Sequence, residues 1–246
     1  MGFSGGPEDK GELARKLVPA KRYSITHDAW IALNGATNGR PGIVAIAGTG
    51  SIAFGCDASG RAARAGGWGF AFGDEGSAFD LSRQAIRAAL RQEEGWGPPT
   101  ALRDALIEAT GARDVNDLLH RFYSDEFPRA RVAALAQLVE ASASRGDVVA
   151  QELLGAAAQA LAVLAGAVRR KLFEGADKVD VRYSGGAFRC RTILARFQLL
   201  MEMDGRTCVS APVFPPAGGA LLGAFRIGGA QCTLKDIPQS AHDDEP

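Results

Sequence analysis

One short stretch of this 246-residue chain has the composition of a phosphate-binding turn. AGTGSIAFG at 47–55 places Gly-Thr-Gly-Ser between two apolar runs. Consecutive backbone N–H groups in such a turn bind phosphate oxygens, and the two hydroxyls add donors. A plain hairpin turn would have the same residues, so the tetrapeptide alone leaves both interpretations open. The chain contains no GxxxxGK[ST] loop, which excludes a Walker A motif.

A second stretch, GGWGFAFGDEGSAF at 66–79, places glycines, aromatic side chains and a carboxylate close together. Bare backbone at Gly67 and Gly69 lets a ligand approach, and Trp68 offers a flat apolar face on which a pyranose ring can stack. Asp74 comes just before a predicted helix, where an acidic residue also serves as an N-cap. The stretch is therefore either a binding loop or a capped helix with a core tryptophan.

Two further features could take part in chemistry. Asp28 follows a predicted strand and precedes a helix, where it is either a general base or an N-cap. His27 beside it is a weaker candidate for a base. The clusters SGGAF and GGALLGA (184–188 and 218–224) each follow a strand and open a helix, so they either face a flat ligand or allow close helix packing.

The elements that must position these residues are those of an α/β protein. The pattern predicts a β-meander with Gly-rich turns, then a long helical region, and then two strand–turn–helix units. The predicted helices are 8–16, 29–36, 76–93, one or two within 100–122, and 129–173 with a break near 144–147. The predicted strands are 21–26, 42–47, 51–56 and 61–65, with later strands opening 179–188 and 208–229.

The bulk composition excludes several classes of function. Lys+Arg and Asp+Glu both number 28, so the balanced charge offers no basic stripe for nucleic acid and no electrostatic attachment to a membrane. No apolar run of the length of a membrane span is evident. The four cysteines form no CxxC pair, which argues against zinc and iron–sulfur sites and favours a cytoplasmic location.

Taken in order, Asp28, the GTGS turn, GGWGxxxGDEGSA, SGGAF and GGALLGA resemble the N-acetylglucosamine kinases of the BadF/BadG/BcrA/BcrD ATPase family. That family is part of the actin, sugar-kinase and Hsp70 superfamily, and the resemblance runs from about residue 20 to 229. It implies a ribonuclease H-like, actin-like ATPase domain with a helical insertion, plus the remnant of a preceding domain of the same kind. The implied units are 1–38 for the remnant, 39–230 for the kinase domain and 231–246 for a polar tail.

The resemblance also implies roles for the residues. Asp28 would be the base that takes the proton from the sugar 6-hydroxyl, and the substrates would be ATP and an amino sugar, with Mg²⁺ on the ATP phosphates. No protein metal ligands are expected, and relatives suggest a homodimer. Ser51, Gly67, Trp68, Gly69 and Asp74 would bind the sugar. Gly48, Thr49, Gly50, Gly185, Gly186, Gly218 and Gly219 would bind ATP.

The sequence departs from the family pattern at its start. Members carry a DGGGT-like phosphate motif in the first hairpin, and neither DGGG nor GGGT occurs here. GFSGG at 2–6 is instead similar to the late part of that first domain. An N-terminally truncated kinase with impaired activity is therefore expected. A non-catalytic sugar-binding remnant and an ATPase activator of the 2-hydroxyacyl-CoA dehydratase type are the alternatives.

Overall fold

Five strands form the central sheet of the computed structural model, which describes residues 1–3, 8–175, 178–230 and 234. The strand order is β5-β4-β3-β6-β7. β3 (Gly42–Ala47), β4 (Ser51–Cys56) and β5 (Ala62–Gly66) make the predicted antiparallel meander. β6 (Val179–Ser184) and β7 (Thr207–Ser210) extend the sheet in parallel with β3. The α/β architecture expected from the sequence is confirmed.

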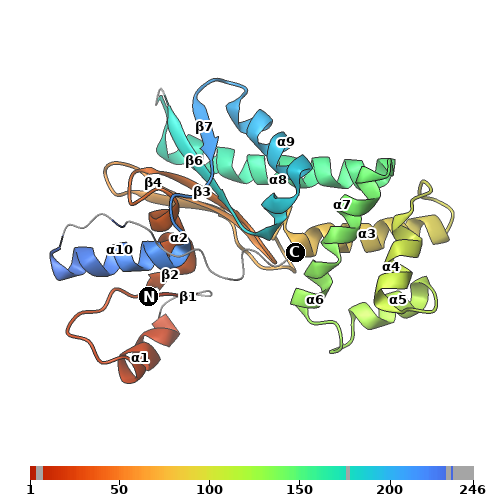
Figure 1. The fold of residues 1–246 in the computed structure, drawn as a ribbon, viewed down its shortest axis with the longest axis horizontal. Coiled ribbons are helices and arrows are strands. Elements are labelled where there is room, and N and C mark those ends of the chain that lie inside the picture. The colour runs from red at the N-terminus through yellow and green to blue at the C-terminus, as the bar shows by residue number, and fades with distance from the viewer. Residues whose placement is uncertain (4–7, 176–177, 231–233, 235–246) are drawn as a thin grey trace.

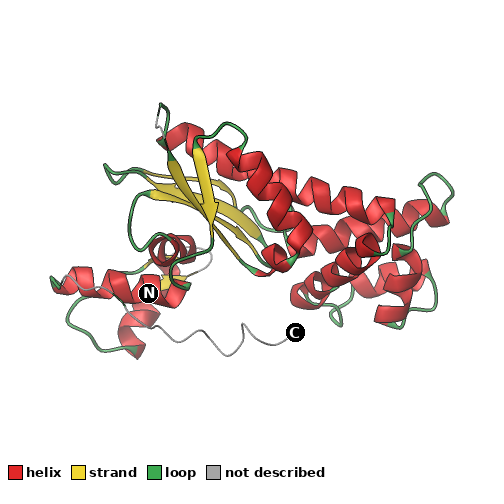
Figure 2. Cartoon of the chain, turned by 45° about the horizontal axis from the view of Figure 1, so that its top comes forward, coloured by secondary structure: helices red, strands yellow, loops and turns green. Residues whose placement is uncertain are grey.

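Helices cover both faces of this sheet (Figures 1 and 2). α8 (Val148–Leu172) and α9 (Arg191–Glu202), which follows the 3-10 turn η1 (Gly186–Arg189), lie on one face. α2 (Asp28–Ala36) lies on the other face and packs against α10 (Pro216–Gly228). Successive side chains of a strand point to opposite faces. Ile43 accordingly packs in the cluster with α8, while Val44 packs with Leu33 of α2.

A helical layer separates β5 from β6 in the chain. It contains α3 (Ala78–Glu93), α4 (Leu102–Thr110), α5 (Val115–Phe122), α6 (Arg129–Ala134) and α7 (Ala136–Ser144), followed by α8. Figure 1 shows α3 to α7 beyond one end of the sheet, with α8 running from them across its face. The predicted break at 144–147 is confirmed, and Asp147 caps α8 by accepting from Ala150 N–H at 2.8 Å.

By length and composition alone, one helix among the described residues could cross a membrane, and this is α8. It packs against β3, β4 and β5, and Leu154, Leu161 and Val168 are buried in the core. These contacts are those of a core helix.

The first described residues form a small separate arrangement. β1 (Gly2–Phe3) pairs in parallel with β2 (Thr26–His27), and α1 (Glu8–Leu17) lies between them in sequence. The predicted strand over 21–26 is therefore wrong except at its end. The strand is short because its partner is short: among the described residues, β1 offers only two residues for pairing. The predicted tail at 231–246 lies outside the described residues, Leu234 excepted.

Candidate functional site

The turn after β3 presents free backbone donors, as a phosphate-binding turn must. Gly48 N–H donates to Gly50 O at 2.9 Å, which closes the turn. Ser51 N–H donates to the Asp74 carboxylate at 3.2 Å. Among the described residues, no partner takes the N–H groups of Thr49 and Gly50, and Thr49 is exposed. Two adjacent donors thus remain available at the end of β3.

The loop between β5 and α3 exposes the predicted aromatic surface. Gly66, Gly67 and Gly69 all have φ between 73° and 79°, so the chain turns sharply around Trp68. Trp68 is 67% exposed, and the Arg64 guanidinium lies 4.6 Å from its ring centroid. This exposure rules out the interpretation of Trp68 as a core residue.

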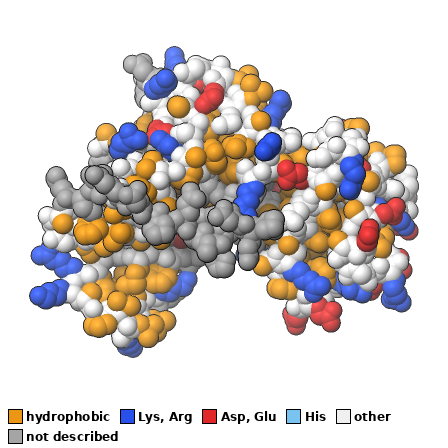
Figure 3. Space-filling view, in the orientation of Figure 1, with side chains coloured by type: hydrophobic (Ala, Val, Ile, Leu, Met, Phe, Trp, Pro, Cys, Tyr) orange, Lys and Arg blue, Asp and Glu red, His pale blue; other side chains and the backbone are white. Residues whose placement is uncertain are grey.

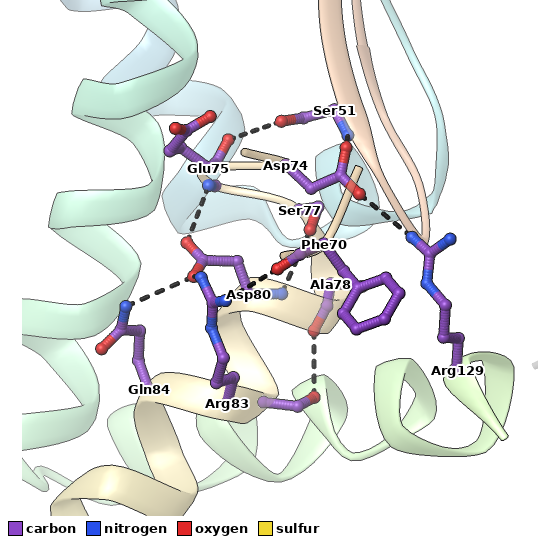
Figure 4. Close-up of polar contacts among 12 residues, drawn as sticks. Ser51, Phe70, Asp74, Glu75, Ser77, Ala78, Asp80, Arg83, Gln84 and Arg129 are labelled. Atoms are coloured by element: carbon purple, nitrogen blue, oxygen red, sulfur yellow. Dashed lines mark hydrogen bonds and ion pairs between the residues drawn. The ribbon is translucent and has the colours of Figure 1, made fainter. Parts of the chain in front are cut away.

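Asp74 is buried and doubly held (Figure 4). It has φ +62°, a left-handed conformation that is uncommon outside glycine. Its Oδ1 accepts from Ser51 N–H, and its Oδ2 forms an ion pair with Arg129 at 3.0 Å. The N-cap of α3 is Ser77, whose hydroxyl accepts from Asp80 N–H at 3.1 Å. Asp74 is therefore not the helix cap that the sequence left open as an alternative.

A second layer of polar contacts holds this loop to α3 (Figure 4). Asp80 Oδ2 accepts from Gly76 N–H at 3.0 Å, and Asp80 Oδ1 pairs with Arg83 at 2.7 Å. Arg83 also donates to Phe70 O at 2.9 Å. Asp80 and Arg83 of α3 therefore hold the loop at Phe70 and Gly76, on either side of Asp74.

Gly185 lets the end of β6 lie directly against the GTGS turn. It has φ +103°, and a Cβ there would overlap the carbonyl of Ala47 and approach Gly48 N at 3.0 Å. Only glycine permits this approach. Gly186, the first residue of η1, has open space around it. The first of the two predicted Gly clusters thus lies beside the GTGS turn.

The second Gly cluster lies in a helix contact. Gly218 and Gly219 are buried in α10, and a Cβ on Gly219 would overlap the carbonyl of Ile31 and the N of Gly35 in α2. Close helix packing therefore accounts for glycine at 219. A cavity of 290 Å³ lies beside it, between residues 20–26, α2 and α10.

That cavity is separate from the turn and the loop. Trp30, Asn34 and Gly219 are among its lining residues, whereas the GTGS turn and Asp74 are not. Exposed apolar side chains lie on the neighbouring helices, and Figure 3 shows hydrophobic atoms over this part of the molecule. These are Leu13 and Leu17 of α1 and Leu221 and Phe225 of α10.

Asp28 is the first residue of α2 and is exposed. Its Oδ1 accepts from Ala29 N–H at 2.8 Å. α2 leads through a short turn into β3 and packs on it. In the described part of the chain, no hydrogen bond or ion pair joins Asp28 to the other predicted site residues.

Sequence reasoning missed Arg129. It lies 55 residues after Asp74, in the first turn of α6, and no local motif marks it.

No metal-binding cluster is found in the part of the chain that the structure describes: no group of three or more His, Cys, Asp or Glu there could hold an ion. The described cysteines are likewise spread, with Cys56 on β4, Cys190 before α9 and Cys208 on β7.

Two curated relatives align with most of this chain. One is an N-acetylmuramic acid/N-acetylglucosamine kinase from Clostridium acetobutylicum, 35% identical over 182 residues, or 73% of this chain. The chain spans 60% of the length of that relative. The other is an N-acetyl-D-glucosamine kinase from Dictyostelium discoideum, 30% identical over 90% of this chain and 73% of the relative.

Solved structures show the same fold. A protein from Chromobacterium violaceum, provisionally named an N-acetylglucosamine kinase, superposes with a TM-score of 0.73 at 29% identity over 90% of this chain and 73% of its own. A Porphyromonas gingivalis protein with the same provisional name has a TM-score of 0.67 at 19% identity, over 91% and 74%, and shows the fold alone. Residues 2–225 match the BadF/BadG/BcrA/BcrD ATPase family. This chain belongs to the BadF/BadG/BcrA/BcrD ATPase family.

Proposed function

We propose that this chain supplies the sugar- and phosphate-binding parts of an ATP-dependent amino sugar kinase, which phosphorylates N-acetylglucosamine or glucosamine at O6. One observation carries this proposal: the Ser51 N–H to Asp74 bond makes the GTGS turn and the Trp68 loop neighbours. A phosphoryl donor on the turn and a sugar on the loop would then be adjacent. The two relatives named as N-acetylglucosamine kinases support the same substrate class.

The proposed sugar pocket uses the exposed face of Trp68 and the backbone at Gly67 and Gly69. Asp74 would accept sugar hydroxyls, because an ionised carboxylate has about four lone-pair sites and two of them are taken here. The Ser51 hydroxyl donates to Glu75 O at 2.7 Å and can still accept a bond.

The proposed phosphate contacts are the unpaired N–H groups of Thr49 and Gly50, with the Thr49 hydroxyl beside them. Gly48 closes that turn, and Gly185 lies against it. Gly186 offers open backbone toward adenosine. Gly218 and Gly219 remain proposed adenosine neighbours, although Gly219 is already required by the α2–α10 contact.

Asp28 is the proposed general base. Phosphoryl transfer depends mainly on positioning and charge neutralisation, and a carboxylate that accepts the hydroxyl proton completes the arrangement. The exposed Asp28 carboxylate at the N-terminus of α2 can reach a substrate hydroxyl without first leaving a buried ion pair. Its exposure therefore fits a role that is completed only when substrate binds.

Mg²⁺ would neutralise charge on the ATP phosphates. The proposal assigns this ion no protein ligands. The ion would be held mainly by phosphate oxygens and water, because Mg²⁺ loses its water reluctantly and usually keeps several water ligands.

The proposal also covers the domain organisation. Residues 1–38 and 39–230 would be the two domain units, and the helices α3 to α7 would be an insertion in the second. The chain would act as a homodimer.

Product analysis tests the position of transfer. The chain is incubated with ATP, Mg²⁺ and ¹³C-labelled N-acetylglucosamine, and the sugar carbon coupled to ³¹P is identified by NMR. Coupling to C6 supports the proposal. Coupling to C1 would sink it, because a hydroxyl at the anomeric carbon requires a different orientation of the ring toward Asp28.

A further inference from the structure

We propose that Arg129 is a positioning residue of the sugar pocket, which fixes the Asp74 carboxylate from α6. This inference rests on the proposed function for its consequence in sugar binding. Its structural part concerns Asp74 alone and is testable without sugar. Nothing in the sequence near Asp74 signals this partner.

Asp74 needs an external constraint. Its left-handed backbone costs free energy for a residue with a Cβ, of order 1–3 kcal/mol. The carboxylate is also buried, with its side chain 6% exposed, and a buried charge is costly unless it is paired. Ser51 N–H satisfies one oxygen, and the Arg129 guanidinium satisfies the other.

Arg129 is itself held in place. Its guanidinium lies 4.8 Å from the ring centroid of Phe70 and 5.7 Å from that of Phe79. Phe79 is buried, and the two rings meet edge to face at 5.4 Å. Stacking on aromatic faces favours a fixed, planar guanidinium. Arg129, held by Phe70 of the loop and Phe79 of α3, thus fixes one oxygen of Asp74, and Ser51 N–H fixes the other.

The helix does not require this cation. A positive charge in the first turn of a helix faces the positive end of the helix dipole, which is unfavourable. The contact with Asp74 explains the position of Arg129 better than the stability of α6 does. The Arg129 side chain remains 45% exposed.

The opposite role is also chemically reasonable, and it predicts the opposite sign. If Arg129 merely occupies a lone pair that the sugar needs, removal of its charge strengthens sugar binding. If Arg129 positions Asp74, removal of its charge weakens sugar binding more than it weakens ATP binding. A structural role alone would weaken both together.

Calorimetry on the 246-residue chain separates these roles. N-acetylglucosamine and a non-hydrolysable ATP analogue are titrated into wild type, Arg129→Met and Arg129→Lys. Loss of a charged hydrogen bond predicts that Arg129→Met weakens sugar binding about tenfold or more. The affinity for the ATP analogue falls less than the sugar affinity, because Arg129 makes no contact with the Thr49 and Gly50 N–H groups. Arg129→Lys recovers part of the sugar affinity because it keeps the charge.

Arg131→Met is the matched control. Arg131 belongs to the same helix, and its guanidinium stacks on Phe127 at 4.3 Å without contacting Asp74. This variant loses the same charge and the same kind of aromatic contact, and we expect wild-type sugar affinity.

Hydrogen exchange of the Ser51 amide provides the sugar-independent measurement. Its N–H donates to Asp74 Oδ1, so exchange is faster in Arg129→Met than in wild type if Arg129 fixes that carboxylate. Unchanged Ser51 exchange overturns the proposal, as does tighter sugar binding or an equal loss of sugar and ATP affinity. If wild type binds no amino sugar, the proposed function fails, and the exchange measurement alone decides the role of Arg129.

Discussion

The backbone N–H of Ser51 donates to Oδ1 of Asp74 at 3.2 Å, and this bond joins two segments that are 23 residues apart in sequence. Two further bonds support it: the Ser51 hydroxyl donates to Glu75 O at 2.7 Å, and Ala78 N–H donates to Gly48 O at 2.9 Å. The turn after β3 and the loop before α3 are therefore one rigid unit. Transfer between two bound substrates benefits from such fixed geometry.

Asp28→Asn is expected to lower kcat of sugar phosphorylation about 10²- to 10⁴-fold, the usual contribution of a general base. The melting temperature should not change, because Asp28 is exposed and its hydrogen bond is to the adjacent residue. Steady-state kinetics and thermal unfolding measure both. Asp125→Asn, at another exposed carboxylate, serves as the control. A wild-type rate in Asp28→Asn would remove Asp28 from the mechanism.

Trp68→Ala is expected to weaken N-acetylglucosamine binding several-fold while leaving ATP binding and stability near wild type. The chain offers a closely matched control in Trp96, which is 65% exposed and lies 4.9 Å under Arg91, as Trp68 is 67% exposed and lies 4.6 Å from Arg64. Calorimetric titration of both variants compares them. If Trp96→Ala loses as much sugar affinity as Trp68→Ala, the loop is not the sugar pocket.

Gly185→Ala is expected to destabilise the chain and to weaken nucleotide binding. The positive φ alone costs about 1–3 kcal/mol for a non-glycine residue, and the added Cβ would overlap the Ala47 carbonyl. Gly186→Ala is the adjacent control, because open space surrounds that position. Chemical denaturation measures both free energies of unfolding. Equal stability of the two variants would contradict the close approach of β6 to the GTGS turn.

The loss of folding stability at low pH should depend on Asp147. Burial opposes its ionisation, but the N–H groups of Ala150 and Ala101 and the hydroxyl of Thr100 donate to the carboxylate and together lower its pKa. A lowered pKa adds stability that is complete above the unfolded value of about 3.9 and is lost as pH falls through the folded value.

Melting temperatures of wild type and Asp147→Asn between about pH 5 and pH 2 test this dependence. The wild-type curve should fall more steeply. Asp104→Asn, which removes an exposed carboxylate paired with Arg103, should follow the wild-type slope. Parallel curves for wild type and Asp147→Asn would show that these hydrogen bonds do not stabilise the charged form.

Local patterns predicted most of the sheet and the turns of the candidate site. The alternation in β4 and the apolar run of β3 identify strands because each face of a strand has its own environment. The glycines around Trp68 predicted a sharply turning loop, and its left-handed residues confirm it. These turns were predictable because turn geometry is encoded within a few residues.

Contacts that depend on tertiary packing were not predictable. Residues 21–25 have strand-like composition, but Arg22 donates to Ile227 O and Tyr23 donates to Val18 O instead of joining a sheet. A strand requires a neighbour of matching length, which composition does not reveal. Arg129 meets Asp74 only because α6 packs on α3. That contact depends on how two helices cross, and no spacing in the sequence encodes it.

Sugar-dependent ADP release by the 246-residue chain tests the central claim most directly. Purified chain is assayed with ATP and Mg²⁺ in a coupled ADP assay, with N-acetylglucosamine, glucosamine or N-acetylmannosamine at millimolar concentration. The account predicts ADP release that depends on N-acetylglucosamine or glucosamine and is strongly reduced in Asp28→Asn. No ADP release above the sugar-free background with any of the three sugars would contradict it.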